Sequence, residues 1–159
     1  MRSGKGRERS SERSGARRSG ARKPGDLVLS SDAVLAVLTE GAGSKKVEAA
    51  LAAPGTAYID TVSLLEVLSG LTERGLARTE AEEALDALAL RVENVDEDLA
   101  RRAAEVLAEA HVDEVSFSRA FSLVLGQRLG VPTLTADAGL ASADRVNIQG
   151  AKEVVGVIA

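Results

Sequence analysis

The feature that most constrains the fold of this chain is an alternation of short apolar runs with longer amphipathic segments, which begins at residue 27. Apolar runs of a few residues have the length of buried strands, whereas apolar residues spaced three and four apart indicate helices. Strands that alternate with helices favour a parallel sheet covered on both faces, because a crossover between parallel strands needs a long connection. Residues 26–159 are therefore expected to form one α/β domain with a central, mostly parallel sheet.

The same pattern predicts the order of the elements. Strands are expected at 27–29, 56–59, 92–95 and 131–135, with a last apolar stretch at 154–158, and helices at 33–38, 44–53, 63–74, 79–90, 97–110 and 118–129. Gly75 and Gly130 follow two of these helices, a common place for glycine. Asp96 suits the N-cap of the helix at 97–110, and Thr79 with Glu82 has the spacing of a capping box. Local signals thus mark the ends of several helices.

Composition excludes several kinds of site. The chain has no cysteine, which excludes disulfides, zinc–thiolate centres and thiol catalysis. Its only aromatic residues are Tyr58, Phe117 and Phe121, which argues against RNA binding through base stacking. No apolar run approaches the ~20 residues that span a bilayer, and the N-terminus lacks the apolar core of a secretory signal. We expect a cytoplasmic protein with no membrane partner.

Residues 1–25 differ from the rest of the chain in charge. They hold nine Lys and Arg side chains and two Glu, a net charge of +7, so residues 26–159 carry −11 within an overall formal charge of −4. This segment has almost nothing to bury and is expected to be a disordered basic arm. Two interpretations stay open. The arm contacts RNA phosphates through Arg13, Arg17, Arg18, Arg22 and Lys23, or it is a solvated tail or a segment added by an upstream start codon.

Acidic residues follow three of the expected strands. Asp32, Asp60 and Asp137 come just after the strands at 27–29, 56–59 and 131–135. Because the functional crevice of an open parallel sheet lies beyond the carboxyl ends of its strands, these acids are candidates for one site. Each also has a structural alternative, since Asp is common at helix N-caps and in turns.

Four stretches of the chain, in order, resemble the PIN-domain proteins, and most closely the VapC-type toxins of bacterial toxin–antitoxin pairs. They are VLSSDAVLAVL at 28–38, TVSLLEVLSGLTERG at 61–75, VDEDLARRAAEVLAEAH at 95–111 and SFSRAFSLVLGQRLGVPTLTAD at 116–137. The resemblance implies a PIN-like three-layer α/β/α sandwich and an endoribonuclease that uses Mg²⁺ or Mn²⁺ held by four acidic positions. It also implies a homodimer and a small antitoxin as partner, with no DNA expected.

Carried onto this chain, the resemblance fills two of the four acidic positions. Glu66 and Asp137 match, whereas the other two positions fall on Ser30 and Arg119, so the set has a formal charge of −1 where four acids would have −4. At an effective dielectric constant of ~20, unit charges 4 Å apart interact by roughly 4 kcal/mol, so Arg119 opposes the binding of a cation. We expect Arg119 to pair with Glu66 or Asp137.

Two functions stay open on these grounds. The first is a VapC-like RNA-cleaving toxin with weakened or lost catalysis, in which Asp32, Glu66 and Asp137 form a rearranged metal site. The second is a PIN-like module that binds RNA or protein without catalysis. A toxic nuclease that had been inactivated deliberately would carry similar substitutions.

Overall fold

The centre of the protein is a five-stranded sheet in which every strand pair is parallel. The computed structural model describes residues 23, 25–109 and 115–136, together with the backbone of a strand at 155–157. The sheet order is β3-β2-β1-β4-β5, with bounds β1 Leu27–Leu29, β2 Ala57–Asp60, β3 Arg91–Glu93, β4 Thr133–Thr135 and β5 Val155–Val157. The chain builds outward from β1 to β3 and then returns to the other side of β1 with β4. The sheet is therefore doubly wound, and its direction switches between β1 and β4.

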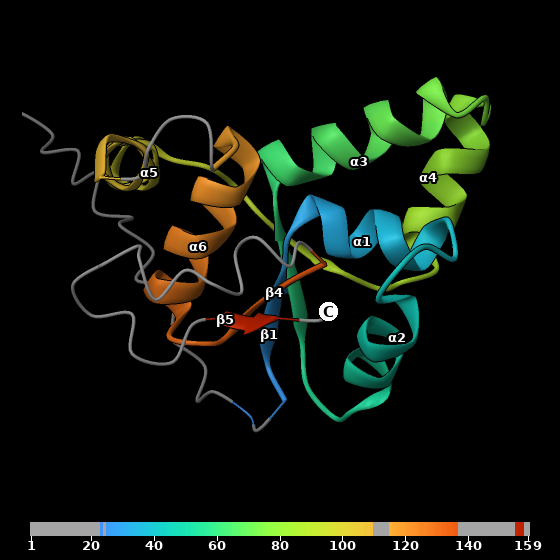
Figure 1. Ribbon diagram of the computed structural model, residues 1–159, viewed down its shortest axis with the longest axis horizontal. Helices are drawn as coiled ribbons and strands as arrows, with labels where there is room; N and C mark the ends of the chain where they lie inside the picture. Colours follow the sequence, from blue (N-terminus) through green and yellow to red (C-terminus); the bar gives the residue numbers. More distant parts are fainter. Residues whose placement is uncertain (1–22, 24, 110–114, 137–154, 158–159) are drawn as a thin grey trace, which may run out of the picture.

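Helices cover both faces of the sheet, as the alternation of elements predicts. They are α1 Ser31–Leu38, α2 Ser44–Ala52, α3 Thr61–Glu73, α4 Arg78–Asp86, α5 Glu97–Glu109 and α6 Phe117–Leu129. In Figure 1, α5 and α6 lie on one side of the strands and α1 to α4 on the other. The predicted three-layer α/β/α sandwich is thus confirmed. Within the described ranges, no helix has both the length and the hydropathy needed to cross a bilayer.

Each layer has its own hydrophobic cluster, and the buried strand β1 contributes to both. Val28 packs with α5 and α6, whereas Leu27 and Leu29 pack with the helices of the opposite layer. This division follows from strand geometry, since successive side chains point to opposite faces of a sheet. Both clusters are almost entirely aliphatic, in keeping with the scarcity of aromatic residues.

Four helices begin one or two residues earlier than predicted. In three of them the residue just before the helix is a polar N-cap. Ser30, Asp60 and Ser116 are the N-cap residues of α1, α3 and α6. Asp32 lies inside α1, so it is not the N-cap that its structural alternative suggested. Ser30, Asp60 and Ser116 are polar residues at the end of a strand or loop, so the apolar periodicity of the helices does not identify them as N-caps.

The predicted capping box of Thr79 and Glu82 is also wrong. Only half of such a box is present, two residues earlier: Glu80 Oε2 accepts a hydrogen bond from the Ala77 N–H at 2.9 Å, and Ala77 has no side-chain oxygen to return one. The helix α4 also ends at Asp86, before the predicted bound, and Ala89 then has a left-handed backbone with φ of 51°. By contrast, Gly75 and Gly130 have positive φ just past α3 and α6, as their positions predict.

Candidate functional site

The candidate site lies where β1 and β4 end side by side. Leu29 pairs with Leu134 in the parallel register, and the Ser30 N–H donates to the Leu134 carbonyl at 3.0 Å. The direction of the sheet switches between these two strands, and in open parallel sheets the functional crevice lies at the carboxyl ends of the strands beside such a switch point. Ser30 and Thr135 are the residues at this edge.

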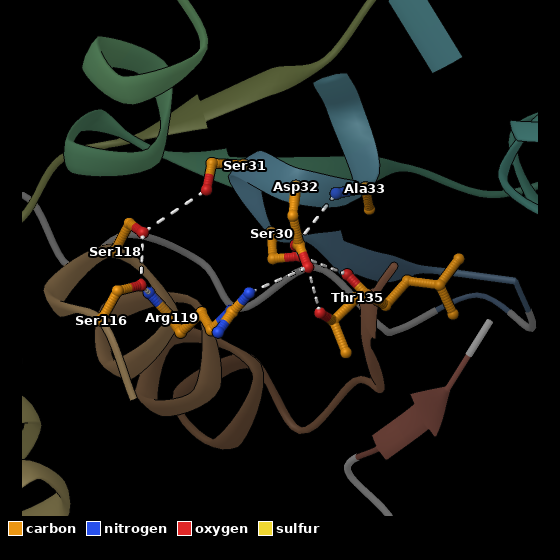
Figure 2. Close-up of polar contacts among 9 residues, drawn as sticks. Ser30, Ser31, Asp32, Ala33, Ser116, Ser118, Arg119 and Thr135 are labelled. Atoms are coloured by element: carbon orange, nitrogen blue, oxygen red, sulfur yellow. Dashed lines mark hydrogen bonds and ion pairs between the residues drawn. The ribbon is translucent and has the colours of Figure 1, made fainter. Parts of the chain in front are cut away.

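Asp32 is the centre of the polar contacts at this edge, as Figure 2 shows. Its Oδ1 accepts hydrogen bonds from the Ser30 hydroxyl and, at 3.0 Å, from the Ala33 N–H. Its Oδ2 accepts from Thr135 Oγ1 at 2.6 Å and lies 3.6 Å from a guanidinium nitrogen of Arg119. An ionised carboxylate offers about four lone-pair sites. The Ser30 hydroxyl also lies 2.9 Å from the Leu134 carbonyl, so it shares its one proton between two acceptors. The Ala33 N–H, the Thr135 hydroxyl, this shared hydroxyl and one cation therefore surround the Asp32 carboxylate.

The first turn of α6 places Arg119 opposite Asp32. Ser116 Oγ accepts from the Arg119 N–H at 3.4 Å, which caps the helix. Ser118 Oγ lies 3.1 Å from Ser116 Oγ at the start of the same helix, and 3.4 Å from Ser31 Oγ, so one long hydroxyl contact connects the first turns of α6 and α1 (Figure 2). The serines bring the two helices close enough for the longer Arg119 and Asp32 side chains to meet.

Arg119 was expected to pair with Glu66 or Asp137. Among the described residues its ion pair is with Asp32 and not with Glu66. Glu66 is exposed on α3, and Asp137 lies outside the described residues. Asp32 was a candidate metal ligand because of its position after β1, and its role as the partner of Arg119 was missed. A carboxylate in the first turn of a helix also suits the helix dipole.

Asp60 is the N-cap of α3, which is the structural alternative to a role in a site. The residue is fully buried, and its Oδ1 accepts from the Ser63 N–H at 2.8 Å. Its Oδ2 accepts from the hydroxyls of Ser63 at 2.7 Å and Ser122 at 3.0 Å. These contacts join α3 to α6 beneath the crevice. The sequence reasoning missed Ser63 and Ser122; the available signal was a short polar residue on an otherwise apolar helix face.

The described residues do not fit the divalent metal that the resemblance implies. Mg²⁺ prefers oxygen ligands in near-octahedral geometry, which needs carboxylates with free lone pairs. Asp32 has little such capacity left, and the residue beside it is a cation. Among the described residues, no group of three or more His, Asp or Glu side chains is arranged to hold a metal ion. The local chemistry at Asp32 is that of an ion pair within a hydrogen-bond network.

Comparisons with known proteins agree with this fold. The PIN domain family matches residues 27–146. The structure of VapC20 from Mycobacterium tuberculosis, a toxin that cleaves the sarcin–ricin loop, is similar with a TM-score of 0.61 at 23% identity, over 74% of this chain and 94% of that one. A toxin–antitoxin complex from Klebsiella pneumoniae has a TM-score of 0.57 at 19% identity, over 84% and 96%.

A third structure extends the comparison. VapBC2 from Rickettsia felis, bound to a DNA fragment from the promoter, has a TM-score of 0.55 at 12% identity, over 73% of this chain and 91% of that one. No curated protein matches by sequence. Likeness at these identities establishes the fold, whereas the family match spans most of the chain. This chain therefore belongs to the PIN domain family and has the fold seen in VapC toxins.

Proposed function

We propose that this chain is a VapC-type PIN protein in which metal-dependent cleavage of RNA is weakened or lost. Its family is of a ribonuclease type, and one structural neighbour is a toxin that cleaves the sarcin–ricin loop. The observation that carries the proposal is the contact between Arg119 and Asp32, at the crevice where the family holds its metal. Arg119 pairs with the Asp32 carboxylate, which a rearranged metal site would need as a ligand.

The size of the effect follows from electrostatics. A metal ion that binds Asp32 must displace Arg119 or accept its repulsion. At an effective dielectric constant of ~20, each unit interaction at about 4 Å is worth roughly 4 kcal/mol. Because about 1.4 kcal/mol is a factor of ten, the affinity for a divalent ion falls by roughly two to three powers of ten. That loss moves metal binding out of the range in which an RNA cleavage site can use it.

Binding functions survive the loss of catalysis in this proposal. The basic residues Arg13, Arg17, Arg18 and Arg22 lie outside the described residues, and Lys23 is exposed. Their charge supports contact with RNA phosphates through salt-sensitive ion pairs. Two neighbours come from toxin–antitoxin systems, which supports a small antitoxin protein as partner. The protein acts in the cytoplasm as a homodimer, and RNA binding without cleavage is its alternative role.

One comparison of variants tests the proposal. RNA cleavage is measured with Mg²⁺ or Mn²⁺ for the full chain, for Ser30→Asp/Arg119→Asp, and for the same double variant with Glu66→Ala. We expect little or no cleavage by the unchanged protein, cleavage by the double variant, and its loss on removal of Glu66. Both substitutions restore acids to the positions that the resemblance assigns, and Glu66 supplies a third.

The contrary result is equally definite. Strong cleavage by the unchanged protein that disappears in Glu66→Ala would show that a rearranged site with Asp32, Glu66 and Asp137 is active. In that case the proposal of weakened catalysis is wrong. Fluorescence anisotropy with the same RNA separates cleavage from binding, since a non-catalytic binding module gives an anisotropy change without products.

A further inference from the structure

We propose that Arg119 is a built-in cation of this PIN fold: its guanidinium offsets the charge of Asp32 and holds the first turns of α1 and α6 together without a divalent metal. This role of Arg119 is to stabilise the folded protein, and it is separate from the loss of RNA cleavage in the proposed function. Stability measurements therefore test it without an RNA substrate.

The first support is geometric. Asp32 connects three elements: its own helix α1, the end of β4 through Thr135, and the first turn of α6 through Arg119. Asp32 and Thr135 are 103 residues apart in sequence. The Asp32 carboxylate thus connects α1, which follows β1, to the end of β4 and to the first turn of α6. In a metal-binding crevice, an ion would make such connections between acidic side chains.

The second support is charge. Asp32 and Arg119 are 23% and 22% exposed, so water screens their interaction only in part. Within the described ranges no other Lys or Arg forms an ion pair with Asp32. Removal of the guanidinium would leave a half-buried carboxylate without a counter-charge, which is costly at this degree of burial. Arg119 is therefore the cation on which the network depends.

A second ion pair shows that burial affects the contribution of an ion pair to stability more than the distance between its charges does. Arg101 lies 2.6 Å from Glu97, a shorter contact than the 3.6 Å between Arg119 and Asp32. Its side chains are 74% and 79% exposed, however, and such surface pairs contribute little to stability. Arg101 is therefore a matched control, because its neutralisation removes an equal charge from a solvated pair.

The first experiment measures thermal unfolding of the full chain in EDTA, and again with Mg²⁺ or Mn²⁺ in millimolar excess. We expect the melting temperature of the unchanged protein to be the same in all three conditions. Arg119→Gln should lower it by roughly 3–8 °C, and Arg101→Gln by no more than about 1 °C. A saturable rise of the unchanged protein's melting temperature with Mn²⁺ would overturn the proposal, as would equal stability of Arg119→Gln.

A double-mutant cycle isolates the pair from the other contacts of Asp32. Asp32→Asn and Arg119→Gln are each expected to lower the melting temperature, and the combined variant should lose less than the sum of the two. Additive losses would mean that the two side chains do not interact, and the built-in cation would be excluded. Asp32→Asn is isosteric, and Arg119→Gln keeps a polar amide on a shorter side chain, so the variants are expected to remain folded.

The last variant converts the built-in cation into an acid. Arg119→Asp places two carboxylates where an ion pair stood, so we expect lower stability in EDTA and a recovery with Mn²⁺ that the unchanged protein does not show. Lack of recovery in a folded Arg119→Asp protein would contradict the proposal. Because the readout is stability, this outcome is independent of whether any variant cleaves RNA.

Discussion

At the scale of single residues, Asp32 and Asp60 follow neighbouring strands but have different roles. Asp60 is fully buried, caps α3 and accepts from the hydroxyls of Ser63 and Ser122. Asp60→Ala removes the cap and leaves two buried hydroxyls without their acceptor. We expect the free energy of unfolding to fall by about 2–4 kcal/mol, measured by urea denaturation.

Asp60→Asn is the control at the same position. It keeps one acceptor oxygen for the Ser63 N–H, and its amide can donate to the serine hydroxyls once they rotate. The loss should therefore be clearly smaller than for Asp60→Ala. Equal losses in the two variants would mean that the carboxylate charge, not the cap, stabilises this part of the core.

At the scale of elements, an ion pair links the start of α5 to the end of α6. Arg128 donates to Asp96 at 2.6 and 2.8 Å. The Arg128 hydrogen bonds, followed by the bond from the Leu99 N–H, lower the pKa of Asp96 to about 2. The Leu99 bond also bears out the predicted role of Asp96 as the cap of α5. Because the folded pKa lies below the ordinary 3.8, the pair stabilises the fold above that pH and loses its effect as the pH falls toward 2.

The pH dependence of Asp96→Asn tests this link. The variant should melt below the unchanged protein at pH 6, and the gap should close as the pH falls from 3.8 toward 2. Circular dichroism melts across that range measure it. Glu97→Gln is the control, because its pair with Arg101 is almost fully solvated. A gap for Asp96→Asn that stays constant with pH would show that lost packing, not lost charge, explains the effect.

At the scale of the whole molecule, charge is separated along the chain. Residues 1–22 hold eight of the nine basic side chains of the first segment, next to a strongly acidic remainder. If the segment contacts RNA, its deletion should weaken binding and flatten the salt dependence, because fewer phosphate counterions are released. Anisotropy titrations at several salt concentrations measure both quantities. A variant with Arg13, Arg17, Arg18 and Arg22 changed to Ser separates charge from length, and unchanged binding in both would assign RNA contact to the domain itself.

Much of the fold was predictable from local pattern. The strand at 27–29 was read from its length and apolar character, and the helix at 44–53 from its periodicity and the Pro-Gly pair that follows. The starts of α1, α3 and α6 were missed because Ser30, Asp60 and Ser116 act as caps only in their three-dimensional setting. Cap geometry depends on the direction in which the chain leaves a strand, which periodicity does not report.

The sequence predicted a site at the carboxyl ends of three strands, but not the contacts found there. Parallel pairing does put the carboxyl ends of β1, β2 and β4 at one edge of the sheet. The substitution of Arg119 into an acidic pattern was also visible in the sequence. Its contact with Asp32 was not, since Asp32 stands two residues past the position that the resemblance assigns and turns back across the edge from inside α1.

The sequence by itself determined the layered α/β fold and its family, and it predicted which four positions would form an acidic site, because periodicity and motif spacing are properties of short stretches. Only the tertiary structure decided which charges meet. Asp32, Arg119 and Thr135 come from α1, α6 and β4, and they are brought together by the parallel pairing of β1 with β4 and the packing of α6 beside them. Contacts between such distant residues depend on the folded backbone. Here the folded backbone places Arg119, which stands at a position where the family has an acid, beside Asp32.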